Sequence, residues 1–131
     1  MRFMVMVKAD KNCEAGVPPS EQFLAELGKF NEELAKAGVL LAAEGLHPST
    51  MGARVKFSGG KPIVTDGPFA EAKEVIGGYW LIQAKSKEEA VEWASRCPAA
   101  EGDVIEVRQV YEMSDHPPEV QQAAGVQDAA L

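Results

Sequence analysis

A chain of 131 residues is long enough for one domain with a single hydrophobic core. Hydrophobic residues make up 46% of it, and no apolar run approaches the roughly 20 residues of a membrane-spanning helix, so we expect no membrane partner. The net charge of −7, without a basic patch, argues against a nucleic acid partner, because a phosphate backbone would be repelled.

The two cysteines, Cys13 and Cys97, are too few for a disulfide framework and predict free thiols in a reducing compartment. Neither has a histidine near it in the sequence, and the spacing of a four-ligand Cys/His metal site is absent. Residues 1–8 have too short an apolar stretch for a signal peptide, and no small-residue cleavage site follows. We therefore expect a cytoplasmic protein without a bound metal.

Residues 2–8 carry apolar side chains on both faces, which predicts a first strand that is buried on both sides. A loop is expected over residues 9–19. A helix follows, with Ser20 as its N-cap, Glu21 at the positive end of its dipole and Gly38 as its C-terminal stop. Its apolar stripe consists of Phe23, Leu24, Leu27, Phe30 and Leu34.

Five further strands are expected, over residues 39–43, 53–57, 63–65, 79–84 and 104–111, and the second and third of these form a hairpin. A second helix begins with a capping box of Ser86 and Glu89 and ends at Pro98. The inner stripe of this helix consists of Ala90, Val91, Ala94 and Cys97. A short helix is expected in the tail, starting near Pro118.

The repeated strand-helix-strand order is the ferredoxin-like split βαβ pattern with an extra hairpin. Right-handed crossovers place both helices on one face of an antiparallel sheet, so we expect an α+β fold of this kind. The strands at 2–8 and 79–84 are apolar on both faces, yet the chain offers no cover for the second face. Because a large exposed apolar face is rare in a monomer, we predict a homodimer through the sheet face, with Met4 and Met6 in the interface.

Several short blocks along the chain resemble the YCII-related, or DGPF-domain, proteins of bacteria. The blocks are Glu44-Gly45-Leu46-His47-Pro48, Val64–Glu71, Lys73-Glu74, Gly77-Gly78-Tyr79-Trp80, Glu92-Trp93-Ala94 and Glu106-Val107-Arg108. The resemblance covers about residues 2–112 and implies a dimeric α+β barrel. We expect a YCII-related/DGPF domain over residues 1–112 and a C-terminal tail over residues 113–131.

The resemblance implies no single activity. Broader relatives of the same fold include small lyases, isomerases and cofactor-independent oxygenases, and a few YCII-like members are thought to use a His-Asp pair for acid-base chemistry. Some DGPF proteins are associated with extracytoplasmic-function sigma factors. This chain departs from the family pattern at Ala72, where threonine is frequent, and at Gln109, where proline is frequent. It also has no histidine in the first strand, which weakens a direct transfer of the His-Asp pair.

The Asp66-Gly67-Pro68-Phe69 turn has a structural and a functional interpretation. In the structural one, the Asp66 carboxylate accepts a hydrogen bond from the N–H of Phe69, because Pro68 has no N–H to offer. Gly67 then takes a positive φ and Phe69 fills the core. In the functional one, mutual repulsion in a charged cluster raises a carboxyl pKa, as a general acid or base requires. That cluster is Asp66, Glu71, Lys73 and Glu74.

Three side chains outside this turn are further candidates. His47 is the one histidine of the domain body, and its unperturbed pKa of about 6.5 suits proton transfer at neutral pH. Arg108 lies in an otherwise apolar strand and needs a carboxylate, from the protein or from a substrate. Tyr79 alternates with Trp80, so one of the two lines a cavity. Each has a plain alternative, namely a surface histidine, an arginine with its head in water or a core aromatic residue.

The best hypothesis is a small-molecule acid-base enzyme of lyase or isomerase type. His47 and Asp66 are its catalytic residues, substrate binding falls to Arg108, Glu71 and Tyr79, and no cofactor is implied. The alternative is a non-catalytic small-ligand-binding or regulatory module, with a possible link to sigma-factor signalling. A third hypothesis is a structural dimer whose Asp66 turn only stabilises the fold. A metal site with Glu44 and His47 is disfavoured, because an extended strand points them to opposite faces.

Overall fold

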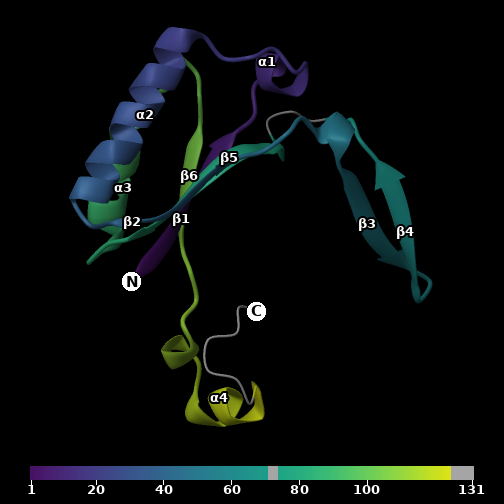
Figure 1. Cartoon of the computed structure of the whole chain (residues 1–131). Helices are drawn as coiled ribbons and strands as arrows, with labels where there is room; N and C mark the ends of the chain where they lie inside the picture. The colour runs from purple at the N-terminus through teal and green to yellow at the C-terminus, as the bar shows by residue number, and fades with distance from the viewer. Residues whose placement is uncertain (71–73, 125–131) are drawn as a thin grey trace.

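The computed structural model describes residues 1–70 and 74–124, and it has the expected α+β fold (Figure 1). Its main sheet is antiparallel with the order β2-β5-β1-β6. These strands are β1 (Arg2–Lys8), β2 (Leu40–Gly45), β5 (Ile76–Gln83) and β6 (Ile105–Gln109). Each crossover skips one strand position, with β5 between β1 and β2 and β1 between β5 and β6. This is the ferredoxin-like arrangement that the sequence predicts.

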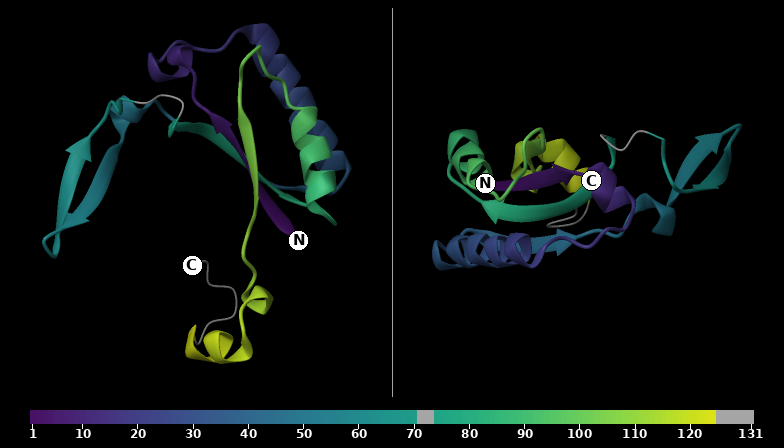
Figure 2. Two further views of the ribbon diagram at one scale, coloured as in Figure 1. Left: turned by 180° about the vertical axis from the view of Figure 1, so that it is seen from behind. Right: turned by 90° about the horizontal axis from the view of Figure 1, so that it is seen from above.

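Two helices cover one face of this sheet, as expected. They are α2 (Glu21–Lys36), which connects β1 to β2, and α3 (Lys87–Ser95), which connects β5 to β6 (Figures 1 and 2). The predicted N-caps are confirmed: Ser20 accepts from the N–H of Phe23 at 3.1 Å, and Ser86 accepts from the N–H of Glu89 at 3.1 Å. Both helices therefore begin where the cap pattern places them.

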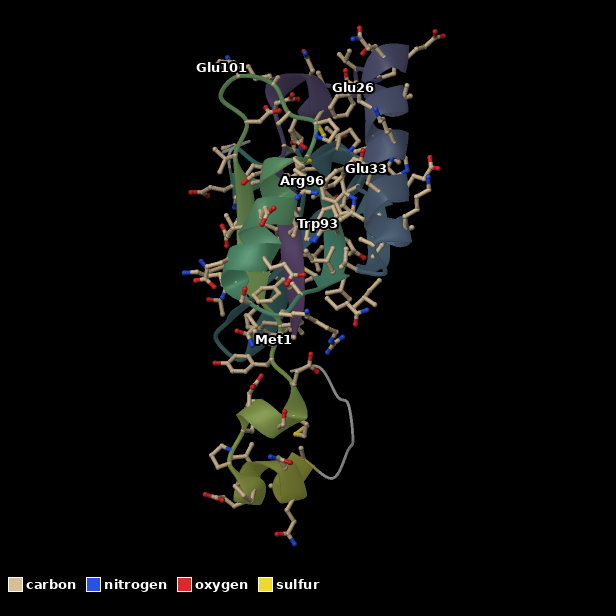
Figure 3. All side chains as sticks on the ribbon, turned by 90° about the vertical axis from the view of Figure 1, so that its left-hand side faces the viewer. Met1, Glu26, Glu33, Trp93, Arg96 and Glu101 are labelled. Carbon is tan, nitrogen blue, oxygen red and sulfur yellow. The ribbon has the colours of Figure 1, made fainter. Side chains whose placement is uncertain are left out.

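The core lies between the two helices and the face of the sheet that they cover. Its buried residues are Phe3, Val5, Phe30, Leu34, Trp80, Ile82, Ala84 and Ala90. The rings of Phe30 and Trp80 meet edge to face, with 5.3 Å between their centroids and an interplanar angle of 85°. Figure 3 looks onto the helix side, where Trp93 and Arg96 lie on α3; the Arg96 guanidinium carbon is 4.6 Å from the centroid of the Trp93 indole.

The predicted apolar stripes are buried only in part. In α2, Phe30 and Leu34 are buried, but Leu24, nearer the start of the helix, is 50% exposed. In α3, Val91 is exposed, and Trp93, which the predicted stripe omits, packs against the core. Phe23 and Leu24 in the first half of α2 are therefore apolar side chains that the core does not cover, whereas Leu27 packs against the core.

Two further α-helices among the described residues are short. The segment predicted as a loop over residues 9–19 contains α1 (Lys11–Glu14), whose N-cap Asp10 accepts from the N–H of Cys13 at 2.7 Å. The predicted tail helix is present as α4 (Pro118–Ala124). None of the described helices is long and apolar enough to cross a membrane.

The face of the sheet opposite the helices carries no described helix (Figure 2). The strand register places Met4 and Leu81 together on this open face, and Met6 beside Tyr79. These side chains are half-buried, so the prediction that β1 is buried on both sides holds only for its helix face within one chain. The open face is the surface through which we predict a homodimer, and that dimer stays a prediction.

The hairpin of β3 (Ala53–Ser58) and β4 (Lys61–Asp66) forms a separate two-stranded sheet that projects from the body (Figure 1). Every residue of both strands is exposed. We call this hairpin the arm.

Replacing Leu34, which is 1% exposed, with alanine leaves a cavity between α2 and the sheet. We expect the free energy of unfolding to fall by about 2–5 kcal/mol. The matched control is Leu24→Ala on the same helix, where the side chain is 50% exposed and the expected loss is below about 1 kcal/mol. Urea denaturation followed by circular dichroism measures both, and equal losses would contradict this assignment of the core.

Candidate functional site

Ser49, in the short 3-10 helix η1 (Ser49–Met51), joins three segments of the chain through hydrogen bonds. Its backbone N–H donates to Glu14 Oε1 at 2.8 Å, and its hydroxyl donates to Glu14 Oε2. The hydroxyl oxygen also accepts from the N–H of Phe69 at 3.1 Å. Ser49 is 6% exposed and is the one buried polar residue among those that the structure describes. Its hydroxyl is satisfied both as donor and as acceptor.

The Asp66-Gly67-Pro68-Phe69 turn is held by Ser49 and not by Asp66. The N–H of Phe69 donates to Ser49, so the predicted Asp66 cap is wrong. The peptide bond between Gly67 and Pro68 is cis, and Gly67 does not take the positive φ that we predicted. Glycine is required for a different reason, because a Cβ at Gly67 would lie 1.8 Å from the carbonyl oxygen of Ser49.

Phe69 is also placed differently from the prediction. It is half-buried and lies outside the core cluster. The guanidinium carbon of Arg54 lies 3.8 Å from the centroid of its ring, in a cation-π contact at the base of the arm. The turn therefore ties the arm to η1, and its phenylalanine packs against the arm rather than inside the sheet.

A cavity of about 710 Å³ opens on the helix side of the sheet, within the range of small-molecule sites. Its walls come from α1, the first half of α2, the ends of β2 and β5, and the segment around residues 97–103. Six of its apolar side chains are Val17, Phe23, Leu24, Leu27, Leu46 and Ile105. The apolar side chains of α2 that the core leaves uncovered, Phe23 and Leu24, thus form part of a cavity wall.

Asn31 and Trp80 form a hydrogen-bonded pair that borders this cavity. The indole N–H of Trp80 donates to Asn31 Oδ1 at 2.6 Å. Because an indole N–H is only a donor, this bond fixes which end of the amide faces Trp80. No hydrogen bond from the two N–H donors of the Asn31 amide to a described residue is found, and Asn31 is one of the residues that line the cavity.

The predicted site residues do not converge on this cavity. His47 and Tyr79 border it; His47 is exposed, and the strand register places the Tyr79 side chain on the face opposite Trp80. Asp66 lies at the base of the arm, paired with Ala53, and does not border the cavity.

The remaining two candidates lie elsewhere. Arg108 shares the open face with Met4; its side chain is 73% exposed, and its Nη1 lies 4.0 Å from Glu106 Oε2. Glu71 lies outside the described residues. Arg108 is therefore an exposed arginine on the far side of the sheet from the cavity, with its head in water.

Both cysteines border the cavity, a location that sequence reasoning missed. They are free, as predicted. Burial, helped by Asp103, raises the pKa of Cys97 to about 11. Burial also raises the pKa of Cys13, with Asp10 and Glu14 adding to the shift. At neutral pH both thiols are protonated, which makes them weak nucleophiles and poor metal ligands. Across residues 1–70 and 74–124, no three His, Cys, Asp or Glu side chains are grouped to hold a metal ion.

Comparison with known proteins adds a family to this geometry. The model of the YCII-related domain matches residues 1–114. The chain belongs to the YCII-related domain family. An uncharacterized protein of Rhizobium meliloti (strain 1021) is 38% identical to this YCII-related domain over 74 residues. That alignment covers 56% of this chain and 60% of the relative, so it spans less than two thirds of the relative's length.

Replacing Ser49 with alanine in this YCII-related domain removes the acceptor for the Phe69 N–H and one donor to Glu14. We expect the free energy of unfolding to fall by about 1–3 kcal/mol, because the partly buried N–H of Phe69 loses its partner. Ser58→Ala, at an exposed end of β3, is the control and should change stability by less than about 0.5 kcal/mol. Chemical denaturation at neutral pH compares the two, and a neutral Ser49→Ala would contradict the role of Ser49.

The same variant makes a pH prediction. The hydrogen bonds from the Ser49 side chain and, second, from its backbone hold the pKa of Glu14 below its ordinary value of 4.5. A carboxyl with a lowered folded pKa stabilises the protein above its unfolded pKa, and that contribution is lost as pH falls through the folded pKa. In Ser49→Ala we expect the pKa of Glu14 to rise toward 4.5 in an NMR titration of its carboxyl carbon. An unchanged titration would contradict this cause.

Gly67→Ala should be strongly destabilising, because the new methyl group would overlap the Ser49 carbonyl oxygen. We expect a loss of at least about 2 kcal/mol. Gly45→Ala is the control, since a Cβ at Gly45 meets nothing within 4 Å and its φ is not positive. Thermal unfolding of the two variants tests the close approach, and a wild-type melting temperature for Gly67→Ala would refute it.

Proposed function

We propose that this YCII-related domain binds a small, largely apolar molecule that carries a hydrogen-bond acceptor. The molecule occupies the cavity between α1, α2 and the ends of β2 and β5. The observation that carries this proposal is the cavity itself, which combines apolar walls with one oriented amide.

The apolar walls favour an apolar ligand. Phe23, Leu24 and Leu46 border the cavity and are 36%, 50% and 46% exposed. Covering such side chains releases water from their surface and contributes about 25 cal/mol for each Å² of apolar area. Exposed leucine and phenylalanine side chains gathered around one hollow are typical of a binding site.

The oriented amide favours a ligand with an acceptor, such as a carbonyl or an ether oxygen. Trp80 holds the amide oxygen of Asn31, which leaves the two amide N–H donors for the ligand. A donor whose geometry is fixed before binding loses little entropy when the ligand arrives, so it contributes to specificity as well as affinity. Arg108, which we expected to bind a substrate acid, belongs to the open face. The charged residues that line the cavity are one cation, Lys8, and three acids, Asp10, Glu44 and Asp103, and this favours a neutral ligand over an acid.

An acid-base enzyme of lyase or isomerase type is the second candidate. His47 favours it, because this histidine borders the cavity and could move a proton to or from a bound molecule. Asp66, its expected partner, does not border the cavity. Binding therefore has more support than catalysis. A regulatory role, including sigma-factor signalling, rests on the family resemblance alone.

The predicted homodimer through the open sheet face is part of the same proposal. Met4, Met6 and Leu81 lie on that face without a covering helix, and they are only half-buried. Since the cavity lies on the helix side, such a dimer leaves both cavities accessible.

A thermal-shift screen of wild-type protein against a library of small neutral metabolites tests the proposal, and we expect apolar carbonyl compounds to stabilise it. In Asn31→Asp, which keeps the acceptor for Trp80 but removes both donors, a hit should bind at least about 10-fold more weakly. The absence of any neutral hit would contradict the proposal, as would a hit that binds Asn31→Asp as well as wild type.

A matched pair of variants locates the bound molecule. Leu24→Trp fills the cavity and should weaken binding at least about 10-fold. Val91→Trp, at a similarly exposed position on α3 that does not line the cavity, should leave binding unchanged. Product formation that is lost in His47→Gln, with binding retained, would favour the enzyme. Binding without turnover would favour the binding module.

A further inference from the structure

The arm is held to the rest of the described chain at its base, by the Arg54–Phe69 contact and the Gly67–Gly52 hydrogen bond. Its strands pair from Ala53 with Asp66 to Ser58 with Lys61, and they make no extensive contact with any other described element. Figures 1 and 2 show it reaching away from both the sheet and the helices. An isolated two-stranded hairpin is at best marginally stable in water. A further surface must therefore support it.

The two faces of the arm differ in chemistry. Cross-strand pairs put apolar side chains on one face: Val55 opposite Val64, and Phe57 opposite Pro62. The other face carries Arg54, Lys56, Ser58, Lys61, Ile63 and Thr65. On the apolar face Phe57 is 77% exposed and Val64 is 64% exposed. A strand pair with one apolar face is the pattern of a sheet that packs on something along that face.

The chain exposes far more surface than a compact protein of its mass. Its accessible area is 9355 Å², whereas a compact monomer of 14.1 kDa exposes roughly 6,700 Å². The difference is about 2,600 Å², and the arm and α4 both project in Figure 1. In a standard interface each partner buries roughly 800 Å², which is about one third of this excess area. The surplus is therefore large enough for a stable association.

Charge favours a second copy of this chain as the partner. The arm, residues 53–66, carries three positive charges and one negative charge, and the net charge of the chain is −7, so the rest of it carries −9. The three cations lie on the face opposite the apolar one, so they act at a distance: the net positive arm of one copy is attracted to the acidic body of another, while two arms repel each other. A contact between the arm of one copy and the body of the other is therefore favoured over a contact between the two arms.

We propose that the arm clasps a second copy of this chain. In a two-fold dimer whose open sheet faces pack together, the apolar face of each arm lies against the partner's body beside that interface. This inference rests on the proposed dimer. It adds that the arm, and not the sheet alone, holds the two copies together. Each copy then supplies one arm and receives one, which closes the assembly at two chains.

Sedimentation equilibrium on the full chain tests the clasp with a pair of neighbouring residues in β4. Val64→Ser, on the apolar face, should raise the dimer Kd at least about 10-fold, and Phe57→Ser on β3 at least about 30-fold. Ile63→Ser is the matched control: Ile63 is 50% exposed but lies on the opposite face, so its Kd should change less than about threefold. Equal effects of Val64→Ser and Ile63→Ser would overturn the clasp.

Leu81→Lys on the open sheet face separates failure of the clasp from failure of the dimer. If Leu81→Lys dissociates the dimer while Phe57→Ser and Val64→Ser do not, the dimer stands and the clasp is wrong. If wild-type protein is monomeric at roughly 100 μM, both are wrong.

Hydrogen exchange tests the clasp on wild-type protein alone: the amides of the arm should be protected from exchange above the dimer Kd and unprotected below it. Protection that is the same at both concentrations would overturn the clasp.

Discussion

The hydrogen bonds of Ser49 hold the Asp66 turn, the base of the arm and one wall of the cavity in a single arrangement. Glu14 accepts two of these bonds and belongs to α1, which borders the cavity. Phe69 donates the third and follows the last strand of the arm. Gly67 packs so closely on the Ser49 carbonyl that no side chain fits between them. The motif that identifies the family is therefore a docking contact between segments that are far apart in the sequence.

The cavity and the arm share this anchor. His47 and Pro48 border the cavity immediately before Ser49, and the arm begins at Ala53, a few residues after it. A ligand that orders the cavity wall would also order the root of the arm, because Glu14 and Ser49 move as a hydrogen-bonded pair. If the proposed ligand and the proposed dimer both form, binding and assembly would be linked through this short stretch of backbone rather than through the core.

Much of the fold could be predicted from the sequence because packing imposes the periods that the sequence displays. The strands, both main helices and the ferredoxin-like order follow from alternation and helical spacing. The same spacing cannot distinguish a core from a cavity wall, since both require an apolar face. This is why Leu24 was assigned to the core together with Leu34 although it lines a hollow.

The candidate site was harder to predict because its contacts span long separations. The Phe69 N–H bonds to a serine 20 residues earlier, and that serine bonds to a glutamate 35 residues earlier still. Local turn chemistry could only offer Asp66 as the cap. The position of Arg108 follows from the strand register. Val107 faces the core, so the side chain of Arg108, the next residue in the strand, faces away from it. His47 was found because its residue type is rare in this chain.

The base of the arm is closed by a hydrogen bond from the Gly67 N–H to the Gly52 carbonyl at 3.0 Å, so the hairpin enters and leaves the body at one point. At its far end, the turn at Gly59 and Gly60, a Cβ added to either glycine would meet nothing within 4 Å. Adding two residues to each strand there would lengthen the arm by about 7 Å and keep every side chain on its original face. The reach of the arm can therefore evolve independently of the cavity, so that relatives with the same interior can differ in how, and with whom, they assemble.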